Sequence, residues 1–225
     1  PCVVVVGAGI INLLTALYLA QLGSGIPILE QKSFGAAASG RNGGAVMMMG
    51  RELMEIPFAR HSINLWEKLS RKRINTLFER NGHLMVARNS VEIDKLEKAY
   101  ELYVEAGIPM KLMDNDEMRN YIPHVGSHIK LGLFSFEDAQ SYPFTTIYSL
   151  IKYLKTKGVQ FYPYTEAMAF ETYGRMIQGV VTDEKVLRGD YYLLGVGPWS
   201  SKLGELLNEH IEIRPRRSQL MVTEV

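Results

Sequence analysis

Two glycines and one acidic residue near the amino end have the types and spacing of a dinucleotide-binding site. Gly7 and Gly9 directly follow a run of valines, and Glu30 lies 21 residues after Gly9. In such a site the first glycine permits a tight strand-to-helix turn, and the second lets the backbone approach a pyrophosphate at the positive end of a helix. The acid accepts hydrogen bonds from ribose hydroxyls and would repel a 2′-phosphate. Ile10 and Ile11, which begin the predicted helix, complete this first set of candidate cofactor-binding residues.

Asn12 stands at the third position of this pattern, where a glycine normally allows the helix to pack closely against the strand. Several explanations stay open. The helix shifts slightly, the asparagine amide forms local hydrogen bonds, or the loop has opened and lost its ligand. A variant residue in the sequence itself is a further explanation.

The elements that position these residues follow from the hydrophobic pattern. Residues 3–6 form a continuous β-branched run, which is typical of a strand buried on both faces. Residues 10–22 predict a helix that ends at Gly23, and residues 26–29 predict a second strand. Because strand, glycine turn, helix, second strand and terminal acid occur in this order, the motif is far more specific than a glycine pattern alone.

The rest of the chain alternates helices and strands. Helices are predicted over residues 58–80 and 91–106 and after Pro143, and strands over residues 83–87, 131–136, 159–163, 166–172, 176–182 and 190–195. A parallel βαβ beginning is thus followed by helices and by a later βα unit with a hairpin. This order indicates one nucleotide-binding domain of the α/β class, interrupted by a segment that belongs to a second domain.

Two further segments are suited to close approach by a ligand. The first contains Ser39, Arg41, Asn42, Gly43 and Gly44, and such a loop exposes backbone N–H groups to an anion or a flat ring. The guanidinium of Arg41 could complement the negative charge of a pyrophosphate.

The second segment contains Gly195, Gly197 and Trp199 and follows an apolar strand. A strand that ends in glycines at a sheet edge permits close approach to a dinucleotide, although Trp199 can equally be a core residue.

Bulk composition excludes several classes of function. The 25 basic and 24 acidic residues give a net charge of +1, so there is no electrostatic footprint for nucleic acid. A single cysteine excludes a disulfide framework and a cysteine-rich metal site and fits a reducing compartment. The apolar stretches are too short and interrupted to span a bilayer. We expect no metal and a cytoplasmic protein, with peripheral contact to a membrane left open.

With these residues in view, the chain resembles the FAD-dependent amine oxidoreductases of the D-amino-acid oxidase superfamily. The resemblance rests on Glu30-Gln31, on the run from Ala38 to Gly44, on Gly195 to Ser200 and on Pro215 to Gln219. The Ser-Gly-Arg-Asn-Gly-Gly run is most similar to the β subunits of heterotetrameric sarcosine oxidase and of dye-linked L-proline dehydrogenase. The family implies FAD as cofactor and oxidation of an amino or imino acid such as proline or sarcosine, by hydride transfer to the flavin.

The resemblance also implies roles for individual residues. Glu30 and Gln31 would lie at the adenosine, and the loop from residue 39 to residue 44 would pass along the pyrophosphate and flavin ring. Ala167 stands where the family often has a valine whose backbone meets the adenine. The run from Asp138 to Tyr142 departs from the family, which puts substrate chemistry inferred there in doubt. We name no catalytic residue, because groups that bind the substrate carboxylate would lie mainly in a later part of such a protein.

The domain organisation implied by the resemblance is discontinuous. We expect a Rossmann-like FAD-binding domain at residues 1–80 and 143–214, and an interleaved α+β substrate domain at residues 81–142 and 215–225. Family members continue well beyond residue 225, so the fold looks incomplete at its carboxyl end. An exposed sheet edge would be poorly stable alone. We therefore expect further sequence or a partner chain, in a hetero- or homo-oligomer with an unidentified electron acceptor.

Two rival functions stay open at this point. A nicotinamide-dependent Rossmann dehydrogenase explains Gly7, Gly9 and Glu30 but leaves the two later glycine-containing segments unexplained. A non-catalytic nucleotide-binding subunit of a larger complex would account for Asn12 and for the shortness of the chain.

Overall fold

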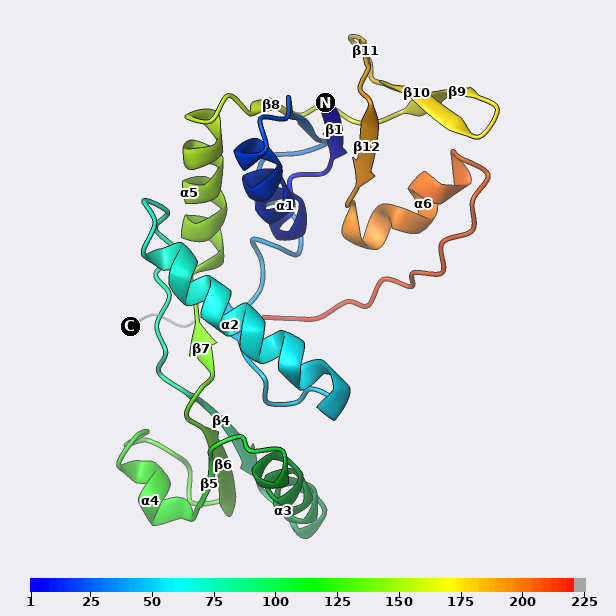
Figure 1. The fold of residues 1–225 in the computed structure, drawn as a ribbon. Coiled ribbons are helices and arrows are strands. Elements are labelled where there is room, and N and C mark those ends of the chain that lie inside the picture. Colours follow the sequence, from blue (N-terminus) through cyan, green and yellow to red (C-terminus); the bar gives the residue numbers. More distant parts are fainter. Residues whose placement is uncertain (221–225) are drawn as a thin grey trace. The chain divides into compact units, whose positions relative to one another are not determined.

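A computed structural model describes residues 1–220 (Figure 1). The chain divides into two compact units, which are considered one at a time. The first unit contains residues 1–43, residues 73–76 and the chain from residue 142 onward. The second unit contains residues 44–72 and 77–141.

The first unit is built on a parallel sheet with the strand order β12-β1-β2-β8. Its strands are β1 (Val3–Val6), β2 (Pro27–Glu30), β8 (Gln160–Pro163) and β12 (Tyr191–Leu194). Together with α1 (Ile10–Gln21), the first two strands form the βαβ unit that the sequence predicts. Because β1, β2 and β12 are parallel, the turns that follow them meet at one edge of the sheet.

Both faces of this sheet are covered, as the all-buried valine strand requires. The helices α1 and α5 (Pro143–Lys155) lie side by side (Figure 1). The opposite side carries a small antiparallel sheet and a short helix, α6 (Ser200–Glu205), which follows the 3₁₀ turn η2 (Gly197–Trp199). The strands of this small sheet are β9 (Ala169–Tyr173), β10 (Met176–Val181) and β11 (Val186–Leu187). Val4, Val6, Leu29, Ala167, Val180 and Leu203 form one apolar cluster.

The second unit combines an antiparallel sheet with helices. Its strand order is β4-β6-β5, from β4 (His83–Ala87), β6 (Leu131–Ser135) and β5 (Met110–Met113). The remaining elements are β3 (Ala45–Val46), η1 (Leu53–Glu55), α2 (Ile56–Ser70), α3 (Ser90–Glu105), α4 (Asn115–Arg119) and β7 (Ala139–Gln140). The main apolar cluster joins α2 and α3 to the sheet, and a smaller one packs α4 beside it. This α+β arrangement agrees with the predicted fold class.

One predicted helix is too long. The pattern predicts a helix over residues 58–80, but α2 ends at Ser70. Ile74 is fully buried, and Leu77 has a φ of 46°, which a helix cannot contain. The apolar positions after Ser70 therefore keep a helical spacing by coincidence: a non-helical segment buries Ile74 and leaves Leu77 exposed.

The predicted domains and the compact units are different descriptions of the chain. Residues 44–72 belong to the second unit, whereas the sequence prediction assigns them to the FAD-binding domain. The roles of the two parts in binding cofactor and substrate stay predictions. Residues 221–225, the end of the predicted substrate domain, lie outside the described residues.

Asp138 is a buried carboxylate that organises the second unit. It has no exposed surface, and its oxygens accept hydrogen bonds from the backbone N–H groups of Met48 at 2.7 Å and Met49 at 3.1 Å. Both methionines are buried in the main apolar cluster, as expected for core residues. Asp138, the first residue of the run that departs from the family pattern, therefore has a structural role. The carboxylate satisfies two backbone donors that the apolar cluster would otherwise leave without a partner.

We expect Asp138→Asn to destabilise the second unit, because an amide supplies only one acceptor for two buried donors. A buried donor without a partner costs about 1–3 kcal/mol. Hydrogen exchange at the Met48 and Met49 amides and urea unfolding would measure the effect. Asp94→Asn, on the exposed face of α3, removes the same charge and is the control. Equal behaviour of the two variants would contradict this role for Asp138.

Candidate dinucleotide-binding site

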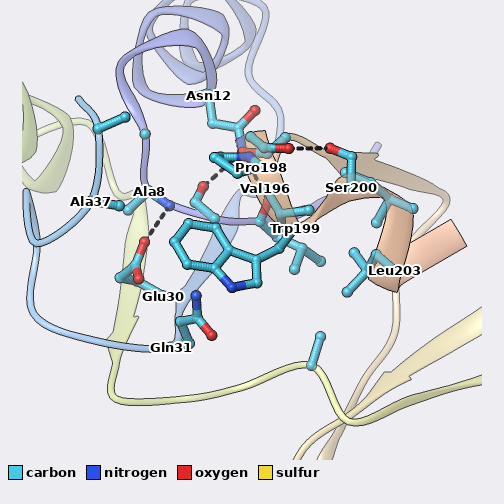
Figure 2. Close-up of a pocket in the computed structure, with 18 of the residues that line it drawn as sticks. Ala8, Asn12, Glu30, Gln31, Ala37, Val196, Pro198, Trp199, Ser200 and Leu203 are labelled. Carbon is cyan, nitrogen blue, oxygen red and sulfur yellow. Dashed lines mark hydrogen bonds between the residues drawn. The ribbon is translucent and has the colours of Figure 1, made fainter. Parts of the chain in front are cut away.

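A cavity of about 950 Å³ lies at the carboxyl edge of the parallel sheet, within the first unit (Figure 2). It is bordered by the turns that follow β1, β2 and β12. Its volume falls at the upper end of the usual range for small-molecule and cofactor sites. The position, outside the carboxyl ends of parallel strands, is where open α/β sheets generally bind their ligands.

Most of the sequence-predicted residues line this cavity. They are Gly7, Gly9, Ile10, Ile11, Glu30, Gln31, Ser39, Ala167, Gly195, Gly197 and Trp199. Three others, Arg41, Asn42 and Gly43, are exposed and are not among its lining residues. Gly44 is buried and belongs to the second unit. The structure thus brings four separate stretches of the chain together (residues 7–11, 30–39, 167 and 195–199) but does not place the end of the glycine loop at the cavity.

The turn before α1 has the features of an anion site. Gly7 has a φ of 96°, and a Cβ there would lie 2.8 Å from the carbonyl oxygen of Gly195, so a side chain is excluded on both grounds. Gly9 is the N-cap residue of α1, and the first turn of the helix carries no acidic side chain. The partial positive charge of the helix end is therefore available to a phosphate.

Ser39 connects the glycine loop to this helix end. Its Oγ accepts a hydrogen bond from the Ile10 N–H at 3.1 Å, and a Cβ on Gly9 would lie 3.3 Å from the same oxygen. The loop around it is closed by Asn42, whose amide donates to the carbonyls of Ala38 and Ser39. The Ser39 hydroxyl is thus held at the N-terminus of α1, where an oxygen of a ligand could also accept hydrogen bonds from backbone N–H groups.

Glu30 is fixed by the backbone on either side. One carboxylate oxygen accepts from the Ala8 N–H at 3.0 Å (Figure 2). The other accepts from the Lys32 N–H, also at 3.0 Å. A carboxylate has about four acceptor positions, so each oxygen keeps one for a ribose hydroxyl. Since both bonds orient the group, Glu30 is more than a solvated acid at a strand end.

Asn12 forms the local hydrogen bonds that were one explanation for its presence. Its side chain is 1% exposed, and its Nδ2 donates to the carbonyls of Val6 at 2.9 Å, Gly7 at 2.7 Å and Gly195 at 3.2 Å. The turn after β1 and the turn after β12 are therefore joined by one amide. The cavity beside this turn shows that the asparagine has not filled the place of a ligand.

Trp199 lies at the cavity and not in the core. It is 37% exposed, and Figure 2 shows its indole among the side chains around the cavity. It sits on η2, whose first residue, Gly197, has a φ of 54°. The carbonyl of Gly197 accepts from the Ser200 hydroxyl at 2.8 Å, which stabilises the step from η2 into α6.

Several lining residues were missed by the sequence analysis. They include Ala36, Ala37, Thr165, Met168, Lys202, Leu203, Leu206, Ile213 and Arg214. Lys202 pairs with Glu166, and Arg214 with Glu212, both at 3.5 Å. The only available signal was the position of these residues next to recognised segments, because no motif marks them.

Within residues 1–220, no helix is long and apolar enough to cross a membrane. Over the same residues, no group of three or more histidine, cysteine, aspartate or glutamate side chains could hold a metal ion.

Comparison with known proteins identifies the family. Residues 2–225 match the family model described as FAD dependent oxidoreductase, abbreviated DAO. The chain belongs to this family. The family's cofactor is FAD, which agrees with the sequence prediction and favours flavin over nicotinamide for this cavity.

Related sequences carry diverse functions. The chain is 22% identical to anaerobic glycerol-3-phosphate dehydrogenase subunit A1 of Haloferax volcanii, over 99% of this chain and 40% of the relative. It is 25% identical to the mitochondrial pyruvate dehydrogenase phosphatase regulatory subunit of Mus musculus, over 92% of this chain and 24% of the relative. It is also 22% identical to D-amino acid dehydrogenase of Vibrio cholerae, over 95% of this chain and 64% of the relative.

Solved structures share the fold. L-proline dehydrogenase from P. horikoshii superimposes with a TM-score of 0.83 at 21% identity, over 92% of this chain and 55% of that one. L-alpha-glycerophosphate oxidase from Mycoplasma pneumoniae, solved with FAD bound, gives a TM-score of 0.78 at 19% identity, over 91% of this chain and 57% of that one. The chain therefore spans between a quarter and two thirds of the length of these relatives.

The residues at the cavity fit an adenine dinucleotide. The helix end free of acidic side chains suits a pyrophosphate, and the oriented carboxylate of Glu30 suits ribose hydroxyls. Because Gly7 and Gly9 have no side chains, a ligand can approach the backbone of this turn closely.

We expect Glu30→Gln to weaken FAD binding about tenfold or more, because the amide loses the charge and turns its NH₂ group toward a backbone donor. Titration of the flavin-free protein with FAD, followed by flavin fluorescence, would measure the dissociation constant. Glu184→Gln is the control, since Glu184 is an exposed acid that is not among the cavity residues. Unchanged affinity in Glu30→Gln would remove this carboxylate from the site.

Proposed function

We propose that this chain forms the FAD-binding part of an oxidoreductase that oxidises the C–N bond of an amino acid or amine. The observation that carries the proposal is the convergence of three predicted segments on one cavity. These are the glycine turn at residues 7–9, the strand end at Glu30 and the segment at residues 195–199. Membership of the FAD-dependent family supports the cofactor.

The roles of the cavity residues follow from their chemistry. The N-terminus of α1, with Gly7 and Gly9, would hold the pyrophosphate, and Glu30 would accept from the ribose of the adenosine. Gln31 and the backbone of Ala167 would lie at the adenosine side of the cavity. When bound, FAD supplies the acceptor for the hydride that leaves the substrate carbon next to nitrogen. The chain's own groups orient the cofactor and exclude water from it.

We also propose that Arg41, Asn42, Gly43 and Gly44 contact the cofactor in the complete protein. In this structure the first three are exposed. Their sequence resemblance to the family is the support for this role. An arginine near the flavin or pyrophosphate would stabilise negative charge there.

Proline or sarcosine is the proposed substrate class, on the strength of the glycine-rich run at residues 39–44. The structural likeness to L-proline dehydrogenase is a likeness of fold at 21% identity. Because relatives are named for D-amino acids and for glycerol 3-phosphate, the substrate should be tested with a panel that includes both classes of compound. The electron acceptor and the hetero- or homo-oligomeric state are part of the same proposal.

A second candidate function is a non-catalytic FAD-binding subunit. It is favoured by the similarity to a regulatory subunit over 92% of this chain. It is also favoured by Asn12, which departs from the glycine pattern. In this case the cavity would bind FAD without turnover.

Anaerobic reduction of the flavin distinguishes these functions. We expect the purified protein to absorb near ~450 nm and to lose this absorbance with proline, sarcosine or another amino acid, but not with sn-glycerol 3-phosphate. Dye reduction in the native complex would give the rate. Bound flavin that no amine reduces would favour the non-catalytic subunit, and a protein without flavin would overturn both candidates.

A further inference from the structure

We infer that Asn12 and Gly195 form a matched pair that positions the two turns bordering the cofactor cavity. The proposal deepens the proposed function, since it assigns a positioning role in FAD binding to a residue that breaks the glycine pattern. In this pair, an amide at residue 12 requires a glycine at residue 195, and the two together replace the usual glycine at the third position.

The first half of the pair is the amide of Asn12. Its Nδ2 lies 2.7–3.2 Å from three carbonyl oxygens, those of Val6, Gly7 and Gly195. They belong to the end of β1, to the glycine turn and to the turn after β12. Residues 12 and 195 are far apart in sequence, so this side chain is a tertiary link between two turns and not a local helix cap.

The second half is the absence of a side chain at Gly195. A Cβ built on this residue would overlap Asn12, and its three nearest atoms are the Oδ1, Cγ and Nδ2 of that amide. Gly195 does not have the positive φ that would itself require glycine, since its φ lies outside the left-handed region. The need for glycine at residue 195 therefore comes from the side chain of Asn12.

The pair also sets the position of the glycine turn. The Gly195 carbonyl that accepts from Asn12 is the same oxygen that a Cβ on Gly7 would approach at 2.8 Å. Gly7, Asn12 and Gly195 thus share one contact point. A displacement of Gly195 would move the start of α1, where the pyrophosphate is proposed to bind.

The surroundings of the two polar atoms of the amide, Nδ2 and Oδ1, explain why residue 12 is an asparagine. Oδ1 has no hydrogen-bond partner among the described residues, so its burial is unfavourable. Three carbonyl acceptors for Nδ2 offset this loss. An aspartate in the same place would put a carboxylate oxygen in the position of Nδ2, facing the three carbonyl oxygens, and the turns would separate. The polar contacts therefore favour an amide at residue 12. The volume of that amide in turn requires glycine at residue 195.

A double-mutant cycle tests the pair. We expect Gly195→Ala alone to raise the FAD dissociation constant about tenfold or more. Asn12→Gly alone costs less, because a water molecule can enter the space and donate to two of the three carbonyls. In the double variant, Gly195→Ala should add little to the effect of Asn12→Gly, since the overlapping amide is gone. Gly25→Ala is the control, because a Cβ there meets only Cys2 at an ordinary distance of 3.9 Å or more.

Hydrogen exchange of the flavin-free proteins separates this pair from the proposed function. If the natural protein binds no FAD, the proposed function fails, and the pair is still tested by amide protection around residues 7 and 195. If Gly195→Ala is insoluble, recovery of soluble protein by the added Asn12→Gly change supports the pair. An equal effect of Gly195→Ala in both backgrounds would overturn it, as would an insoluble double variant when Asn12→Gly alone folds.

Discussion

The close approach of two backbone turns at the carboxyl edge of a parallel sheet is the constraint on which the site depends. Strands β1 and β12 are adjacent and in register from Val3 with Tyr191 to Val6 with Leu194. Their following turns must therefore pass within contact of each other. Gly7 meets this requirement by having no Cβ to strike the Gly195 carbonyl, and Asn12 meets it by donating to that carbonyl. Without this close approach of the two turns, α1 could not begin at Ile10 with its N-terminus facing the cavity.

The electrostatic character of the cavity is a consequence of the same arrangement. The N-terminus of α1 brings partial positive charge, and the end of β2 brings one carboxylate. The Ala8 N–H holds that carboxylate, so the glycine turn and the strand end are coupled. A ligand with a phosphate at one end and sugar hydroxyls nearby matches both features. The family's FAD dependence agrees with this complementarity.

Sequence and structure agree best where local pattern and burial act together. The valine strand, the helix after Gly9 and the strand ending at Glu30 were all predictable, because β-branched runs and glycine turns leave few alternatives. Agreement is poorest at residues 71–80, where an apolar spacing indicates a helix and the chain instead forms a non-helical segment that buries Ile74. Periodicity cannot tell these two cases apart, since the spacing of apolar residues does not record that Leu77 is exposed while Ile74 is buried.

The sequence by itself determined the dinucleotide motif, the fold class and the family, because these depend on residue types at fixed spacing along the chain. The tertiary structure alone decided which residues meet. It brought Asn12 into hydrogen-bonding distance of Gly195, and Asp138 into hydrogen-bonding distance of Met48 and Met49. It also placed Lys202 and Arg214 at the cavity. The hydrogen-bonded partners lie 183 residues apart for Asn12 and Gly195, and 90 and 89 residues apart for Asp138 with Met48 and Met49. Contact between these partners depends on strand order and on the space that a single Cβ would fill. Neither can be predicted from the spacing of residue types along the chain.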